Sequence, residues 1–282
     1  MNHFPCIIPA AGLGTRMAEI CAATGGAPFK ELLPVAGMPA ILHAVALAAA
    51  AGADTVAVVL RPGKEAIRDC IDQHRQDVAP GCEIVYRWQA EPGGEGRAIL
   101  QCRDVLEGVP AVGVIYPDNL YQPPADGDSR SPLAILREAA EGAGQAAAAV
   151  TDTIGLHRPD AAGQDALAAY ANAGRLDLAP HPACIPGLRL VTRCYAKGPG
   201  PFMPRRPGEA RACGLYVATP RYVEALDAQD KMLPQGEELT DGHARRHLLA
   251  EGRPLQAFLL PGLVFDMGTP AGHALARRHL GA

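Results

Sequence analysis

The sequence has few aromatic residues and no excess of positive charge. Phe, Trp and Tyr make up 5% of the 282 residues, and the formal net charge is -4 at neutral pH. Nucleic acids and anionic membrane surfaces are bound by clusters of Lys and Arg, and single-stranded nucleic acids also by stacking aromatic side chains. We therefore expect neither a nucleic acid nor a membrane as a partner.

Long apolar runs and paired cysteines are also missing. No apolar run reaches the roughly 18 residues that a membrane helix needs, and the alanine-rich run at residues 41–51 is too short. The N-terminus lacks the basic and apolar segments of a secretory signal. The eight cysteines include no C-x-x-C pair, which argues against a zinc site and favours reduced core thiols. These features predict a cytoplasmic protein, and they leave open whether it forms a homo-oligomer.

Short β-branched runs alternate with amphipathic stretches over the first half of the chain. Residues 55–60 (TVAVVL) form a continuous apolar run, which is typical of a strand buried on both faces. The pattern predicts strands at 6–8, 55–60, 83–88 and 111–116, and helices at 39–51, 64–75, 95–106 and 133–141. Such alternation predicts an α/β fold, Rossmann-like and doubly wound, with a mostly parallel (mixed) sheet.

The second half is less regular. A strand is expected at 146–150, after which residues 152–210 are rich in Pro and Gly and offer only short strand candidates such as 188–192. The segment 197–208 reads as a loop. Regular structure is expected again as strands at 212–218 and 255–260 and as helices from Pro220, Thr240 and Pro270. We predict one domain over residues 1–282 with an irregular inserted section, and no appended C-terminal domain.

The stretch IIPAAGLGTRM (7–17) places a glycine-rich loop directly after the first expected strand. Gly12 and Gly14 allow backbone N–H groups to approach a ligand, and clustered N–H groups favour phosphate. Arg16 can grip phosphate oxygens with its fork of donors. The loop is neither a Walker loop nor a full dinucleotide fingerprint, because the Gly-Lys-Ser/Thr and the third glycine are missing. On this stretch alone, a tight turn without a ligand is the alternative.

Four further stretches, taken together with this loop, suggest a family. FKELLPVAGMPAI (29–41), VIYPDNLY (114–121), GEELTDG (236–242) and FDMGTPAGHALA (265–276) follow it in order. The set resembles the sugar-1-phosphate nucleotidylyltransferases, of the glucose-1-phosphate uridylyltransferase and thymidylyltransferase type. The resemblance is strong to about residue 121, weak from 122 to 210 and clear again beyond. It implies that residues 1–121 bind the nucleotide and residues 122–282 the acceptor, with the inserted section binding the sugar.

The resemblance implies a role for most of these motifs. The loop residues Ala11, Gly12, Gly14, Thr15 and Arg16 would wrap the triphosphate. Lys30 would neutralise charge at the reacting phosphates, because attack of one phosphate on another brings two anions together. Arg16, Lys30 and Asp118 are therefore the expected catalytic residues. The alternative for Lys30 is a solvated surface lysine.

Base recognition is expected from the stretch RWQAEPGGEGRAIL (87–100). The amide of Gln89 carries a donor and an acceptor, which match the adjacent N–H and C=O of uracil or thymine. In the family a glutamine and a glycine five residues later read the base, here Gln89 and Gly94, so UTP or dTTP is favoured. An exposed Gln at a strand end is the alternative. Arg97 is left open between phosphate binding and solvation.

Two aspartates each follow an apolar run. Asp118 and Asp266 would lie at strand ends, where α/β sheets bind ligands, and their hard oxygen atoms suit Mg²⁺. In the family the matching residues are the two metal ligands, so Mg²⁺ is the expected cofactor. His243 and His247 lie four residues apart on an expected helix but lack the glutamate of a zincin, so a solvated helix face is expected there.

The acceptor motif departs from the family pattern. Relatives carry Glu-Lys-Pro, whereas YAKGPG (195–200) keeps Lys197 but has Ala196 and Gly198 beside it. Lys197 is expected to bind the acceptor phosphate, while the contact to ring hydroxyls is lost, which favours a modified sugar or a cyclitol phosphate over glucose 1-phosphate. Two alternatives stay open. One is a cytidylyltransferase for an alcohol phosphate or phosphonate, and the other is a non-catalytic nucleotide-sensing protein on the same fold.

Overall fold

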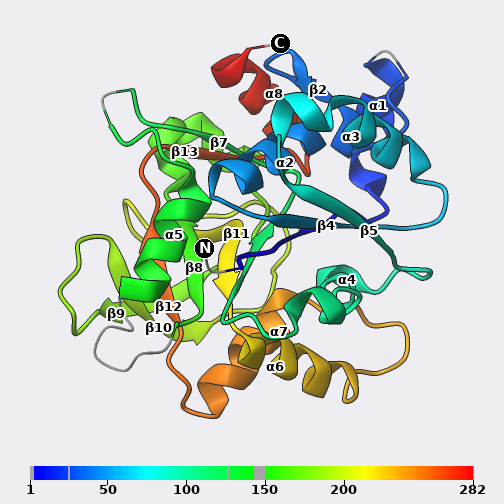
Figure 1. The fold of residues 1–282 in the computed structure, drawn as a ribbon. Coiled ribbons are helices and arrows are strands. Elements are labelled where there is room, and N and C mark those ends of the chain that lie inside the picture. Colours follow the sequence, from blue (N-terminus) through cyan, green and yellow to red (C-terminus); the bar gives the residue numbers. More distant parts are fainter. Residues whose placement is uncertain (1–2, 25, 126, 143–149, 282) are drawn as a thin grey trace.

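A nine-stranded mixed sheet forms the centre of the molecule (Figure 1). The structure is a computed structural model, and it describes residues 3–24, 26–125, 127–142 and 150–281. The strand order is β5-β4-β1-β6-β11-β8-β12-β10-β9. The α/β fold class predicted from the sequence, with its mixed sheet, is confirmed.

Four strands form a parallel half of the sheet, as the alternating pattern predicts. They are β1 (Cys6–Pro9), β4 (Thr55–Leu60), β5 (Glu83–Trp88) and β6 (Val112–Ile115). Neighbouring residues of one strand enter different hydrophobic cores: Val58 packs on one face of the sheet and Val59 on the other. A strand buried on both faces has no solvated side, which explains its continuous apolar sequence.

Helices cover both faces of the parallel half. One face is covered by α2 (Ala40–Ala50), α3 (Glu65–Val78) and α5 (Pro132–Gly142). The other face is covered by α4 (Gly94–Leu100), α6 (Pro220–Asp230) and α7 (Asp241–Ala250). In such a layered arrangement the loops at the carboxyl ends of the strands form the ligand site.

The other half of the sheet is mostly antiparallel and differs from the sequence-based expectation. It contains β11 (Arg211–Ala218), β8 (Thr153–His157), β12 (Gln256–Leu259), β10 (Leu188–Cys194) and β9 (Leu176–Pro180). The strand expected at 188–192 and the loop at 197–208 are confirmed, but β8 and β9 were not predicted. The section from 152 to 210 is therefore irregular over most of its length, but it also adds β8, β9 and β10 to the main sheet.

Two short ribbons lie beside the main sheet and carry functional segments. They are the pairs β7 (Asn119–Gln122) with β13 (Leu263–Asp266) and β2 (Pro34–Val35) with β3 (Met38–Pro39). The C-terminal helix α8 (Pro270–Leu280) packs against β13 and β2, and its Leu275 joins Phe265 and Val35 in one hydrophobic cluster. The remaining elements are α1 (Ala18–Ala23) and the 3-10 turns Thr15–Met17, Lys30–Leu32, Arg103–Leu106, Pro159–Ala162 and Gln164–Ala169.

One predicted helix is shorter than expected, and one predicted strand falls outside the residues that the structure describes. The helix expected at 95–106 ends at Leu100, and a 3-10 turn follows from Arg103. The strand expected at 146–150 falls almost entirely on residues that the structure does not describe.

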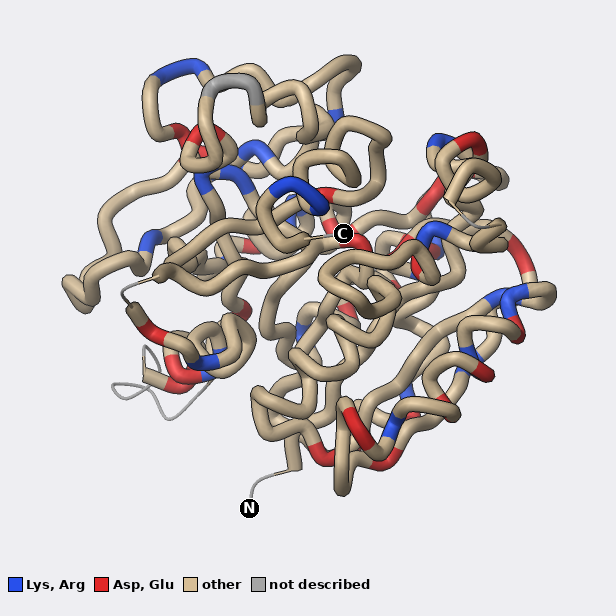
Figure 2. Tube along the Cα trace, turned by 90° about the horizontal axis from the view of Figure 1, so that it is seen from above, with Lys and Arg blue, Asp and Glu red and all other residues tan. Residues whose placement is uncertain are grey.

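All eight cysteines are free. Over the described part of the chain, no helix has both the length and the apolarity to span a membrane, and Figure 2 shows basic and acidic residues interspersed along the outer segments.

Candidate active site

The loop predicted to bind phosphate follows β1 and is fixed at both ends. The Ala10 N–H donates to the Val59 carbonyl at 2.8 Å, and the Met17 N–H donates to the Gly14 carbonyl at 2.9 Å. Gly14 has a φ of 65°, in the left-handed region that glycine adopts without strain. A Cβ atom at Gly12 would meet no other atom within 4 Å. The backbone of the loop is thus open to a ligand, as recognition through N–H groups requires.

A cavity of about 500 Å³ opens beside this loop. Its walls include every site residue predicted from the sequence, namely Ala11, Gly12, Gly14, Thr15, Arg16, Lys30, Gln89, Gly94, Asp118, Lys197 and Asp266. These residues come from segments that are far apart in the chain. The fold therefore brings the predicted set together in one place, and the individual roles stay predictions.

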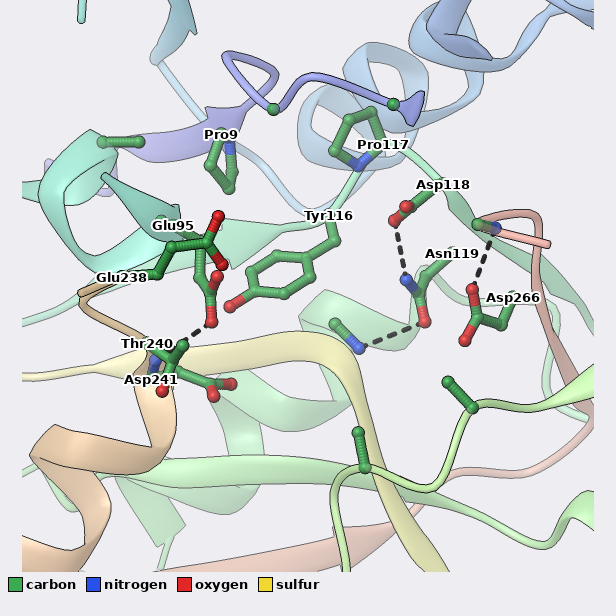
Figure 3. A pocket seen from close by; sticks show the side chains of 18 of the residues that line it. Pro9, Glu95, Tyr116, Pro117, Asp118, Asn119, Glu238, Thr240, Asp241 and Asp266 are labelled. Atoms are coloured by element: carbon green, nitrogen blue, oxygen red, sulfur yellow. Dashed lines mark hydrogen bonds between the residues drawn. The ribbon is translucent and has the colours of Figure 1, made fainter. Parts of the chain in front are cut away.

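The pairing of β7 with β13 brings the two aspartates side by side. In this ribbon Asp266 is in register with Asn119, and the Met267 N–H donates to the Asp118 carbonyl at 2.7 Å. A Cβ atom at Gly268 would lie 3.0 Å from Asp266 Oδ1 and 3.3 Å from Asp118 Oδ2. Glycine therefore keeps open the space between the two carboxylates, which Figure 3 shows on one side of the cavity.

Of the two carboxylates, Asp118 has the closer positive charge. Lys30 Nζ lies 2.5 Å from Asp118 Oδ2. Burial raises the pKa of Asp118, but the ammonium of Lys30 outweighs this effect, so the net pKa is lowered. The pKa of Asp266 is raised by burial and by the charge of Asp118. Two hard carboxylates with an open gap between them suit a divalent cation whose other ligands are phosphates and water.

A buried ion pair connects the two segments expected to hold the triphosphate. Lys64 Nζ donates to the Ala10 carbonyl at 2.7 Å and lies 3.1 Å from Glu31 Oε2. Both side chains of the pair are 1% exposed. Lys64 thereby ties the glycine-rich loop to the turn that carries Lys30. This contact was not predicted from the sequence, because Lys64 reads as the polar start of a surface helix.

The expected base-reading residues lie where β5 meets α4. Gln89 is 6% exposed, and its N–H donates to the Leu60 carbonyl at 2.8 Å. Gly94 has a φ of 84°, and a Cβ atom there would lie 2.4 Å from the Leu239 carbonyl oxygen. Packing against Leu239 thus requires glycine at position 94 whether or not it also contacts a base. The side chain of Arg97 binds Asp230 and the Glu237 carbonyl and is partly exposed to solvent.

Three acidic residues that were not predicted from the sequence line the side of the cavity near Gln89 and Gly94. Figure 3 shows Glu95, Glu238 and Asp241 across from the aspartate pair, with Tyr116 between the two groups. Glu95 accepts a hydrogen bond from the Asp241 N–H at 3.2 Å. Burial and the charge of Asp241 raise the pKa of Glu95 to about 7. The available sequence signal was an acidic residue directly after Gly94.

His243 and His247 show no sign of a metal pair. His243 closes a capping box with Thr240 at the start of α7, and His247 lies 3.3 Å from Glu251. No group of three or more potential metal-ligating side chains occurs among the described residues. These histidines therefore serve the ends and surface of α7.

Lys197 reaches the cavity from the loop that follows β10. This loop is held by bonds from the Gly198 N–H to the Asn172 carbonyl at 2.8 Å and from the Phe202 N–H to the Tyr170 carbonyl at 2.8 Å. A Cβ atom at Gly198 would lie 2.4 Å from Asn172 Nδ2. A side chain at position 198 would therefore require the Asn172 amide to move.

A second cation on this side, Arg211, was not predicted. It stands at the start of β11, lines the cavity and is 5% exposed. Its Nε donates to the Ala173 carbonyl at 2.9 Å, and its Nη1 lies 3.4 Å from His157 Nε2 and 4.0 Å from Asp266 Oδ2. Burial and the charge of Arg211 lower the pKa of His157 well below its ordinary value, so the imidazole is neutral. The sequence signal was a charged residue at the head of an apolar strand.

Comparison with known proteins agrees with this geometry. The family described as "MobA-like NTP transferase domain" matches residues 6–250. A UTP–glucose-1-phosphate uridylyltransferase of Pseudomonas aeruginosa is 32% identical over 131 residues, which is 40% of this chain and 46% of that protein. The chain thus spans less than half of that relative. One from Staphylococcus epidermidis is 26% identical over 290 residues, covering 94% of this chain and 88% of that protein.

A solved structure shares the fold over nearly the whole length. UDP-glucose pyrophosphorylase complexed with UDP-glucose superposes with a TM-score of 0.72 at 22% identity, covering 98% of each chain. The family match covers both the glycine-rich loop and the segment that contains Asp118. The chain belongs to the MobA-like NTP transferase domain family, and its relatives there are sugar-1-phosphate nucleotidylyltransferases, as the sequence motifs predict.

Proposed function

We propose that the protein joins a nucleoside triphosphate, with UTP or dTTP favoured, to a sugar 1-phosphate or a sugar-like phosphate and releases pyrophosphate. The observation that carries this proposal is the convergence of Asp118, Asp266 and Lys30 on the cavity beside the loop that carries Arg16. A protein that only senses a nucleotide needs no such pair of carboxylates. The names of the relatives support the same reaction class.

The reaction needs positioning and charge neutralisation more than acid–base chemistry. An oxygen of the acceptor phosphate forms a bond to the α-phosphorus, while the bond from that phosphorus to the bridging oxygen of pyrophosphate breaks. The attacking group is already an anion, so no general base is required. Lys30 and Arg16 offset the repulsion between the two phosphates. Asp118 and Asp266 would hold Mg²⁺, which would supply further positive charge at the phosphates.

Replacement of Gln89 tests the base assignment. Gln89→Ala should weaken triphosphate binding by about 1–2 kcal/mol, because it removes hydrogen bonds to the base. The preference among the four triphosphates should weaken at the same time. Calorimetric titration with each triphosphate measures both effects. Gln101→Ala is a matched control, because that residue is exposed and its amide bonds to the Arg97 carbonyl on its own helix turn. An unchanged order of affinities in the Gln89 variant would assign base reading to another residue.

One observation favours CTP as a second candidate. Glu95 directly follows Gly94 and places a carboxylate in the cavity wall. A carboxylate accepts a hydrogen bond from the exocyclic amino group of cytosine, which uracil and thymine lack. On this candidate the protein is a cytidylyltransferase, and its acceptor is an alcohol phosphate or a phosphonate.

The wall around Lys197 bears on the acceptor. The segment paired with the Lys197 loop contributes Ala171, Ala173 and Gly174 to the cavity wall, and none of these has a side-chain acceptor for ring hydroxyl groups. A site that lacks such acceptors discriminates poorly in favour of a fully hydroxylated ring. This supports a modified sugar or a cyclitol phosphate over glucose 1-phosphate.

A substrate panel tests the proposed function. Release of pyrophosphate is measured with UTP, dTTP, CTP and GTP, each combined with glucose 1-phosphate, deoxysugar 1-phosphates, cyclitol phosphates and a phosphonate. We expect turnover with UTP or dTTP and a lower kcat/KM for glucose 1-phosphate than for the best acceptor. Turnover with CTP and the phosphonate alone would favour the second candidate. Nucleotide binding without pyrophosphate release in any combination would contradict the assignment of an enzyme.

A further inference from the structure

Arg211 is a buried cation whose hydrogen-bonding capacity is only partly used. A guanidinium has five N–H donors and a permanent positive charge. The contacts made by Arg211 are the Ala173 carbonyl on Nε and the neutral ring of His157 on Nη1. Within the described ranges, no oxygen accepts a hydrogen bond from Nη2, and no carboxylate lies within hydrogen-bonding distance of the guanidinium. Burying a cation in this state is costly unless an anion joins it.

The surroundings of Arg211 direct its free donors toward the cavity. Apolar rings cover the guanidinium elsewhere, since its centre lies 5.5 Å from the ring of Tyr170 and 5.7 Å from that of Phe202. The strand neighbour Gly174, whose carbonyl binds the Ala212 N–H, also lines the cavity and has no side chain to cover the guanidinium. Arg211 thus presents charge to the cavity across a wall of small residues.

The position of Arg211 relates it to the acceptor rather than to the base. Its Nη1 is 4.0 Å from Asp266 Oδ2. Its Nε binds the Ala173 carbonyl, and the nearby Ala171 pairs with Pro201 in the loop that carries Lys197. An oxyanion placed between the aspartate pair and Lys197 therefore lies within reach of Nη2. Gln89 and Gly94 are on a different wall, formed by β5, α4 and the segment at Leu239.

On the basis of the proposed function, we propose that Arg211 binds the phosphate of the acceptor and, with Lys197, sets the requirement for an anionic acceptor. A guanidinium suits this task because its planar fork can meet two phosphate oxygens at once. The nearby Asp266 marks the side of the guanidinium that faces the reacting groups, at 4.0 Å from Nη1.

The test compares the KM values of both substrates in Arg211 variants. In Arg211→Met the KM for the acceptor should rise by about 10- to 100-fold, as expected for a lost charged hydrogen bond, while the KM for the triphosphate stays unchanged. Arg211→Lys keeps the charge but loses the fork, so its acceptor KM should rise by a smaller factor. If Arg211→Met does not fold, as judged by circular dichroism, Arg211→Lys carries the comparison.

Arg175→Met is the matched control. Arg175 pairs with Arg211 in an isolated β-bridge, and its side chain packs on the same Phe202 ring. Its charge is paired with Glu209, and it does not line the cavity. The Arg175→Met variant should be less stable than the wild type, and its acceptor KM should be unchanged. An equal rise of the acceptor KM in both variants would mean that Arg211 has only a structural role.

Two acceptors separate the possible anions. Glucose 1-phosphate and glucuronic acid 1-phosphate share the phosphate, and only the second has a carboxylate on its ring. Equal losses for both in Arg211→Met support phosphate binding, and a loss confined to the second would overturn it in favour of ring-carboxylate binding. A wild-type protein that turns over none of the panel contradicts the proposed function and this assignment with it. An active wild type with unchanged variants contradicts the assignment alone.

Discussion

Asp118→Asn is expected to reduce turnover by about a hundredfold to a thousandfold, the usual size for the loss of one preorganised electrostatic contact in a transition state. The substitution removes a charge and almost no volume, so the fold should persist. Asp266→Asn should have a similar effect, because the two carboxylates face one gap beside Gly268. Pyrophosphate release at saturating substrate and a titration with Mg²⁺ measure the loss, and both variants should need more Mg²⁺ than the wild type.

The control is Asp69→Asn, which removes an exposed carboxylate of α3 that pairs with its neighbour Arg68. This variant should retain wild-type turnover and Mg²⁺ dependence. Full activity of Asp118→Asn, or turnover that survives excess chelator, would contradict the metal assignment.

Lys64→Met is expected to lower the free energy of unfolding by about 3–5 kcal/mol, because it leaves the buried Glu31 carboxylate without its partner. The same change removes the bond to the Ala10 carbonyl, so the phosphate-binding loop loses its tie to the Lys30 turn. Urea unfolding followed by circular dichroism measures the stability. In the surviving folded protein, the KM for the triphosphate should rise more than the KM for the acceptor.

Two comparisons decide whether the buried pair is the cause. The double change Lys64→Met with Glu31→Leu should recover part of the lost stability, since two apolar side chains leave no unpaired charge behind. Lys231→Met removes an exposed lysine paired with Asp227 and should change stability little. A Lys64 variant as stable as the Lys231 variant would show that the pair contributes nothing to the fold.

The sequence predicted best those features that depend on local pattern. The apolar run 55–60 could only be a strand buried on both faces, and the structure confirms it as β4. Asp118 and Asp266 were both predicted at strand ends; Asp118 lies in the short turn between β6 and β7, and Asp266 ends β13. In each case the residues that decide the outcome are neighbours in the chain.

Features that depend on distant pairing were missed. β9 has only five residues, ends in proline and lies at the sheet edge, so its sequence carries a weak strand signal without β10 beside it. The burial of Lys64 depends on Glu31, and the burial of Arg211 depends on the Ala173 carbonyl and on His157 in β8. A polar side chain looks solvated until its partner is known, which is why these cations were not found from the sequence.

The ribbon of β7 and β13 couples ligand binding to the stability of the fold. Asp118 and Asp266 are separated by about half of the chain, and this pairing holds their backbones together. On the proposed function, a substrate complex held by both carboxylates acts as a reversible, noncovalent cross-link between these two distant segments. Its binding energy adds to the stability of the ribbon by mass action. The filled protein therefore opens less readily at this ribbon than the empty one, and each turnover releases and renews that cross-link.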